Sequence, residues 1–159
     1  MPGRSPVSRS DDFKDLFASL SAHGVRALVV GGHAFAFHAR PRYTKDLDVW
    51  VEPTEENSER LLRALEQFGF GGLGLTIEDF TKPGRFVQLG YPPNRIDLLT
   101  SIPGVTFEEA WNRRVEDLFE EQPVAYLSLE DLLRNKQAAG RPQDLADVAV
   151  LKRMAKKSL

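Results

Sequence analysis

The chain contains no cysteine among its 159 residues, and this absence excludes several classes of site. Disulfide scaffolds, cysteine-ligated zinc or iron–sulfur centres and thiol catalysis all need that side chain. The formal charge is only −2, from 21 Lys and Arg against 23 Asp and Glu, so a nucleic-acid contact would need a local basic patch. No apolar run approaches the ~20 residues of a membrane span, and the N-terminus lacks a signal-peptide segment. We therefore expect a soluble protein of a reducing, cytoplasmic compartment without a membrane contact.

The apolar pattern predicts a single α/β (α+β) domain with a small mixed β-sheet flanked by helices. Strands are expected at residues 25–30, 45–52, 85–89, 95–100 and 124–127. Helices are expected at residues 10–23, 33–39, 55–68, 128–139 and 142–155, with a short one after a capping pair of Thr106 and Glu109. We expect a flexible tail over residues 1–9 and one domain over residues 10–159, with its core at 10–127 and its C-terminal helices at 128–156.

Two aspartates, Asp46 and Asp48, are candidate metal ligands because they alternate with apolar residues in a predicted strand. Their spacing places both carboxylates on one face, together with Trp50, which we expect to line the same site. Like charges at this separation raise each other's pKa, and a hard divalent cation such as Mg²⁺ removes the conflict. A polar strand face turned to solvent is the alternative interpretation of such a pair taken alone.

Two further features favour the metal interpretation. Gly31 and Gly32 stand between a predicted strand and a helix, where the backbone can approach an anion closely, although an ordinary turn also uses glycines. Asp97 lies within an apolar strand, where a carboxylate is costly unless it is paired or metal-bound. If this strand lies beside that of Asp46 and Asp48, three carboxylates come within a cross-strand reach of roughly 5 Å. Such a cluster suits a two-metal site for phosphoryl or nucleotidyl transfer.

Taken together, these residues resemble the nucleotidyltransferase fold of the DNA-polymerase-beta superfamily. The resemblance rests on Gly31-Gly32, on the segment Thr44-Lys45-Asp46-Leu47-Asp48 and on the distant Asp97, and it spans about residues 25–151. The closer resemblance is to small bacterial nucleotidyltransferases related to the AbiEii-type toxins. Their C-terminal part also has a helix with a lysine, an Arg-Pro break and an Asp-Leu-x-Asp helix, as in Lys136, Arg141-Pro142 and Asp144-Leu145-Ala146-Asp147. One departure is the Gly-Gly turn, because many active members have Gly-Ser there.

The resemblance implies a metal-dependent enzyme that moves an NMP from an NTP, such as ATP, to an acceptor hydroxyl and releases pyrophosphate. Its catalytic and metal-binding residues would be Asp46, Asp48 and Asp97. They would hold two Mg²⁺ ions, or Mn²⁺ instead of Mg²⁺. Its nucleotide-binding residues would be Gly31, Gly32, Thr44 and Lys136. The acceptor stays open between tRNA or another RNA, a protein and a small molecule, and a toxin-like role with an antitoxin partner is a further expectation.

Several alternatives remain at this stage. Lys136 falls on the apolar stripe of its predicted helix, so it is also explained as a lysine whose stem covers core surface. Asp144 and Asp147 suit the first turn of a helix, and they could position Lys136. The basic residues of the last helix complement its dipole or form a local RNA-binding patch: Lys152, Arg153, Lys156 and Lys157. A catalytically silent nucleotide-binding subunit and a protein-interaction module of a toxin–antitoxin pair are the competing functions.

Overall fold

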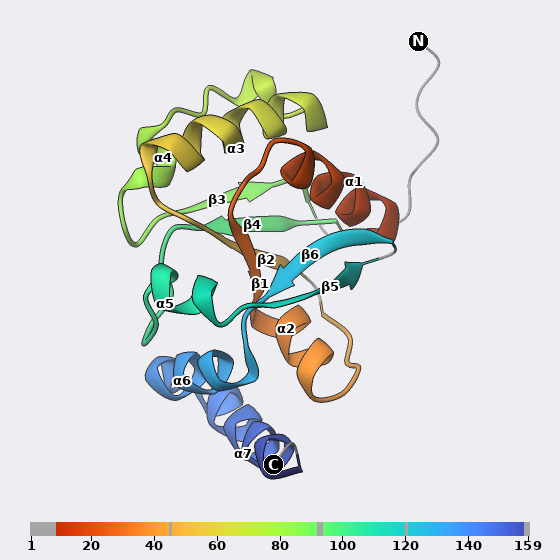
Figure 1. Cartoon of the computed structure of the whole chain (residues 1–159), viewed down its shortest axis with the longest axis vertical. Helices are drawn as coiled ribbons and strands as arrows, with labels where there is room; N and C mark the ends of the chain where they lie inside the picture. The colour runs from red at the N-terminus through yellow and green to blue at the C-terminus, as the bar shows by residue number, and fades with distance from the viewer. Residues whose placement is uncertain (1–8, 45, 92–93, 120, 158–159) are drawn as a thin grey trace.

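The computed structural model describes residues 9–44, 46–91, 94–119 and 121–157 (Figure 1). Its helices are α1 (Arg9–Ala22), α2 (Gly31–His38), α3 (Glu55–Phe68), a 3-10 turn (Gly71–Leu73), α4 (Glu78–Thr81), α5 (Phe107–Asn112), α6 (Leu129–Ala139) and α7 (Pro142–Lys157). Its strands are β1 (Ala27–Val30), β2 (Leu47–Val51), β3 (Phe86–Leu89), β4 (Ile96–Leu99), β5 (Val115–Phe119) and β6 (Gln122–Tyr126). The predicted tail lies outside the described residues except for Arg9, which begins α1, and Lys45 of the predicted motif also lies outside them.

The six strands form one sheet in the order β3-β4-β2-β1-β6-β5. β2 pairs with β4 and β1 with β6 in parallel, whereas the other three pairs are antiparallel. The predicted fold class, a small mixed sheet flanked by helices, is therefore confirmed. β5 was not predicted, because its residues are largely exposed at the sheet edge and show little apolar alternation.

The alternation in β2 divides the protein into two apolar cores, one on each face of the sheet. Val49 and its apolar neighbours on one face pack against α1 and α3. Trp50 on the other face packs with residues of β1, α2, α5, α6 and α7. In Figure 1, α1 and α3 lie on one side of the sheet, and α6 and α7 lie toward the opposite end of the molecule. Trp50 is only 2% exposed and meets Phe107 edge to face, so it belongs to the core instead of lining a site.

Two helix starts show where the capping predictions succeed and fail. The side chain of Ser128 accepts a hydrogen bond from the backbone N–H of Asp131 and caps α6. Thr106 is the N-cap residue of α5 but makes no side-chain capping bond, so the predicted capping pair is wrong. Glu109, the other residue of the predicted pair, instead has its carboxylate 3.5 Å from the guanidinium of Arg113, the C-cap residue of α5.

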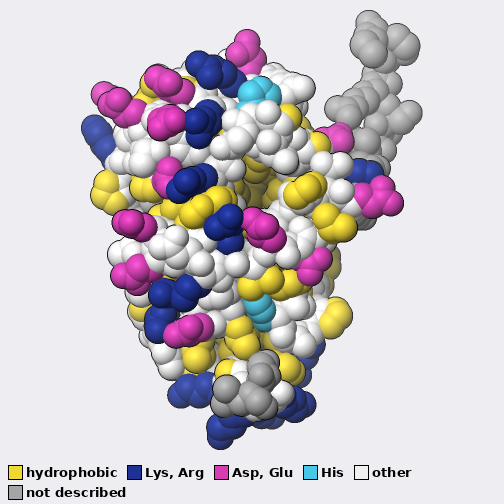
Figure 2. All heavy atoms as spheres, viewed as in Figure 1, with side chains coloured by type: hydrophobic (Ala, Val, Ile, Leu, Met, Phe, Trp, Pro, Cys, Tyr) yellow, Lys and Arg dark blue, Asp and Glu magenta, His cyan; other side chains and the backbone are white. Residues whose placement is uncertain are grey.

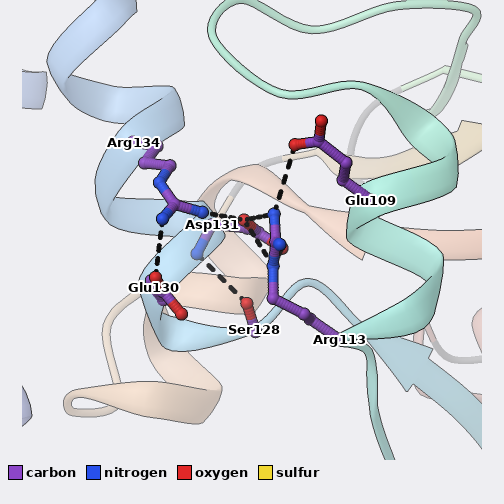
Figure 3. A network of polar contacts seen from close by, with 6 residues as sticks. All are labelled: Glu109, Arg113, Ser128, Glu130, Asp131 and Arg134. Atoms are coloured by element: carbon purple, nitrogen blue, oxygen red, sulfur yellow. Dashed lines mark hydrogen bonds and ion pairs between the residues drawn. The ribbon is translucent and has the colours of Figure 1, made fainter.

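A buried ion cluster joins α5 to α6 (Figure 3). Asp131 is 0% exposed, and its carboxylate accepts hydrogen bonds from Arg113 at 2.8 Å and from Arg134 at 3.1 Å. Since a buried carboxylate is tolerated only with such partners, this cluster ties the C-terminal helices to the segment that follows β4. None of the described helices combines the length and apolar content that crossing a membrane requires.

Candidate active site

The three predicted carboxylates come together at one end of the neighbouring strands β2 and β4. Asp48 and Asp97 are direct partners in the parallel register, and Asp46 stands immediately before β2. Asp97 is 8% exposed, while Asp46 and Asp48 are half-buried. The expectation that the strands of Asp48 and Asp97 are neighbours is thus confirmed, and the sheet itself concentrates negative charge at this point.

The electrostatics of the cluster favour a bound cation. Burial, together with the negative charges of Asp97 and Asp46, raises the pKa of Asp48 to about 6, although Arg95 and Arg141 act in the opposite direction. A carboxyl group with such a pKa stays ionised at neutral pH only at a cost in free energy. A positive charge placed among the three acids would remove that cost.

Arg95, which the sequence pattern did not single out as a site residue, already supplies one such charge. Its Nε and Nη2 donate to the two carboxylate oxygens of Asp97 at 3.0 and 3.1 Å, and its Nε lies 4.0 Å from Asp46 Oδ2. The bond to Asp97 raises the pKa of Arg95 above its ordinary value. The signal was present in the sequence, because residues two apart on a strand share a face. Within the described part of the chain, no three Asp, Glu, His or Cys side chains are already arranged as a metal site.

The remaining oxygen donors fit a hard divalent cation. Asp46 Oδ1 is buried and has no hydrogen-bond partner, an arrangement that costs about 1–3 kcal/mol unless something binds the oxygen. Carboxylate oxygens are the ligands that Mg²⁺ prefers, and it needs only one or two of them beside water and phosphate. Asp46 and Asp48 therefore suit such an ion, whereas both oxygens of Asp97 are engaged by Arg95.

The two glycines form the first turn of α2 and not a separate turn before it. Gly31 has φ of +64°, and a side chain on it would run into Oδ2 of Asp48. A side chain on Gly32 would run into the Cγ2 methyl of Thr44. Since the first turn of α2 has neither a side-chain cap nor an acidic residue, its N–H groups are suited to an anion. The predicted residues Gly31, Gly32 and Thr44 thus adjoin the carboxylates.

Lys136 lies in a buried ion network beside the site. It is 6% exposed, and its Nζ lies 2.9 Å from Asp147 Oδ2 and 3.6 Å from Asp144 Oδ1. The alternative in which the two aspartates position the lysine agrees with these contacts. Its contact with nucleotide phosphates stays a prediction.

The two aspartates of this network also hold arginines. Burial acts to raise the pKa of Asp144 and of Asp147, yet their cationic partners lower both below the ordinary value. Arg42 donates to both oxygens of Asp147 at 2.9 and 3.1 Å, so its guanidinium is held in this network. Arg141 donates to Asp144 at 2.7 Å and keeps 77% of its side chain exposed. Because the charge of Arg141 also acts on Asp48, Arg141 is an outward-facing cation close to the carboxylates.

An apolar cavity of about 230 Å³ lies elsewhere, between α1 and the sheet. Val29 and Val49 line it from β1 and β2. Since Val49 and Asp48 point to opposite faces of β2, this cavity is separated from the carboxylates by the sheet. It is therefore not the candidate active site.

Comparison with known proteins agrees with this geometry. Residues 12–155 match the family described as a nucleotidyltransferase of unknown function (DUF6036). An antigenic nucleotidyltransferase-like protein from Paracoccidioides brasiliensis has a similar structure, with a TM-score of 0.53 and 16% identity over 92% of this chain and 78% of the other. Lincomycin-bound lincosamide adenylyltransferase LnuA gives a TM-score of 0.53 and 12% identity over 91% and 96% of the two chains. A putative nucleotidyltransferase from Thermotoga maritima gives a TM-score of 0.50 and 17% identity over 91% of each of the two chains.

No curated protein sequence matches the chain significantly. The structural neighbours, at these low identities, establish the fold, and the sequence match covers nearly the whole domain. The predicted nucleotidyltransferase superfamily is confirmed, while the closer resemblance to the AbiEii-type toxins stays a prediction. The chain belongs to the nucleotidyltransferase family of unknown function, DUF6036.

Proposed function

We propose that this protein is an active, metal-dependent nucleotidyltransferase that moves an NMP from an NTP to an acceptor hydroxyl and releases pyrophosphate. The observation that carries the proposal is the pairing of Asp48 with Asp97 next to Asp46, whose Oδ1 is buried without a partner. A silent copy of the fold would gain nothing from such a repulsive cluster. The presence of the cluster therefore supports catalysis over a purely structural or binding role.

Each residue near the cluster has a chemical role in this proposal. Asp46 and Asp48 would hold Mg²⁺ or Mn²⁺, which when bound neutralises phosphate charge and orients the triphosphate. Asp97 would accept the proton of the acceptor hydroxyl, as the family resemblance implies. Gly31, Gly32 and Thr44 would let the first turn of α2 approach the phosphates, and the exposed Arg141 would add positive charge.

The distribution of exposed cations supports RNA as the acceptor. Lys and Arg side chains gather at the end of the molecule where α7 ends (Figure 2). Arg40, Arg153 and Lys157 line a pocket of about 160 Å³ there. The cations at this end of the molecule are exposed: Arg40, Lys152, Arg153, Lys156 and Lys157. Such a patch suits a phosphate backbone, whereas a protein or a small neutral acceptor would not need it. A toxin-like role with an antitoxin partner remains a prediction.

A labelling assay with purified protein tests the proposed reaction. The wild type is incubated with each of four radiolabelled NTPs, Mg²⁺ and either total RNA or whole lysate, and labelled product and pyrophosphate are measured. We expect transfer by the wild type and its loss in the double variant Asp46→Asn with Asp48→Asn. The matched control, Glu59→Gln with Glu66→Gln, removes two charges from the exposed face of α3 and should keep activity.

Two results would contradict the proposal. Transfer by the Asp46→Asn, Asp48→Asn variant would show that these carboxylates do not hold the metal. Binding of an NTP to the wild type without pyrophosphate release on any acceptor would favour the silent nucleotide-binding subunit.

A further inference from the structure

The guanidinium of Arg95 lies among the carboxylates where a bound cation would be expected. It donates to both oxygens of Asp97 and stands 4.0 Å from Asp46 Oδ2, and its charge also acts on Asp48. Arg95 is thus a positive charge shared by all three acids. Bidentate pairs of this kind are among the stronger charge-assisted contacts in proteins.

The pair makes Arg95 a competitor for any other partner of Asp97. Each oxygen of Asp97 already accepts one hydrogen bond from Arg95, so a metal ion or a hydroxyl has to use the remaining lone pairs or displace the guanidinium. Asp97 sits in β4 and is 8% exposed, so it cannot move far, whereas Arg95 precedes the strand and keeps 29% of its side chain exposed. The arginine is therefore the member of the pair that is free to turn away.

We propose that Arg95 is an exchangeable internal counter-ion, which holds Asp97 in the metal-free protein and releases it when a divalent cation binds at Asp46 and Asp48. This inference rests on the proposed function, because it assumes that cation. The exchange keeps a positive charge beside the buried acids at every stage. It also leaves a free guanidinium at the edge of the site, where an anionic phosphate of the nucleotide can bind it.

Calorimetric titration of Mg²⁺ and Mn²⁺ tests the competition between Arg95 and the metal. In the Arg95→Gln variant we expect the affinity for each metal ion to rise roughly tenfold, because the arginine no longer competes for the carboxylates. This factor corresponds to about 1.4 kcal/mol of binding free energy. The variant should melt at a lower temperature than the wild type without metal, and Mg²⁺ should raise its melting temperature by more than it raises that of the wild type. Arg85→Gln is the matched control, because Arg85 is exposed and lies beside Thr100, past the other end of β4. Its metal affinity and melting temperature should equal those of the wild type.

Nuclear magnetic resonance of ¹⁵N-labelled arginine side chains tests the exchange in the wild type itself, so the result does not depend on a variant that folds. The Nε–H signal of Arg95 is assigned by its absence in Arg95→Lys. We expect this N–H to be protected from solvent exchange without metal and to lose protection when Mg²⁺ saturates the site. If Mg²⁺ binds in a way that needs Asp46 and Asp48 but leaves the signal unchanged, the exchange is wrong and the proposed function stands. If Mg²⁺ does not bind at all, both are wrong.

Discussion

The Cγ2 methyl of Thr44 occupies the space into which a side chain on residue 32 would project. Gly32 therefore fixes how closely the first turn of α2 approaches the segment that leads into β2 and the carboxylates. The same contact makes Thr44 a packing residue as well as a candidate for nucleotide binding.

We predict that Gly32→Ala lowers the free energy of unfolding by about 1–3 kcal/mol, because the new methyl group overpacks this contact. Thr44→Ser removes Cγ2 and should restore most of the loss when it is combined with Gly32→Ala. Urea denaturation of the three variants measures the effect. Gly31→Ala is the control, because its strain comes from a positive φ and from Asp48, and Thr44→Ser should not rescue it. Equal rescue of both variants would contradict the assignment of the contact.

The raised pKa of Asp48 predicts how stability depends on pH in the presence of a chelator. The folded protein holds the proton of Asp48 up to about pH 6, whereas the unfolded chain releases it near the ordinary value of 3.8. Wild-type stability due to this group is therefore complete below pH 4 and is lost as pH rises through 6. We predict that Asp48→Asn becomes more stable than the wild type by about 2 kcal/mol at pH 7.5 and loses this advantage at pH 4.

Thermal or urea unfolding at a series of pH values between 4 and 8 measures this difference. Added Mg²⁺ should stabilise the wild type and leave Asp48→Asn almost unaffected. A stability difference that stays constant across the pH range would show that the carboxyl group of Asp48 is not perturbed.

The buried position of Lys136 predicts a structural effect of its replacement. Lys136→Met leaves Asp144 and Asp147 with one cationic partner fewer each, so we expect a loss of about 2–3 kcal/mol in the free energy of unfolding. Adding Asp147→Asn should recover part of it. Lys152→Met, at an exposed position of α7, should change stability by less than about 0.5 kcal/mol. A Lys136→Met protein of unchanged stability that no longer binds NTP would instead make Lys136 a phosphate contact.

The basic end of α7 predicts a salt-dependent affinity for RNA. Replacing Lys152, Arg153, Lys156 and Lys157 with Gln should weaken binding of a labelled single-stranded RNA and reduce the slope of log affinity against log salt by about 3. Fluorescence anisotropy at several salt concentrations measures both. The control replaces four cations elsewhere on the chain, Arg60, Arg63, Lys82 and Arg85, and should keep the wild-type slope. An unchanged slope in the α7 variant would rule out this surface as the RNA contact.

The sequence predicted the carboxylate cluster because strand periodicity is a local property. Alternation in β2 assigned Asp48 to one face, and the cost of a buried acid singled out Asp97 before any pairing was known. The sequence alone did not show that the strands of Asp48 and Asp97 pair, because strand pairing depends on which strands become neighbours in the folded protein. The pairing of Asp97 with Arg95 obeys the same periodicity, because residues two apart on a strand share a face.

Other features depend on contacts between segments that the sequence does not relate. Helical spacing indicated that Lys136 faces the core, but its aspartate partners come from α7, and only the crossing of α6 and α7 brings them together. The close approach of Gly32 to Thr44 likewise requires the packed structure. β5 escaped prediction because an edge strand that pairs only with β6 needs no apolar face.

The parallel pairing of β2 with β4 has a consequence for the order of folding. Asp48 and Asp97 meet only after the chain has closed a long loop that contains α3 and β3, and closing such loops is slow. This slow closure limits how soon the cation site can form. A cation that binds only the completed site would stabilise the folded protein, and it would slow unfolding to the extent that the site is still unformed in the transition state for folding.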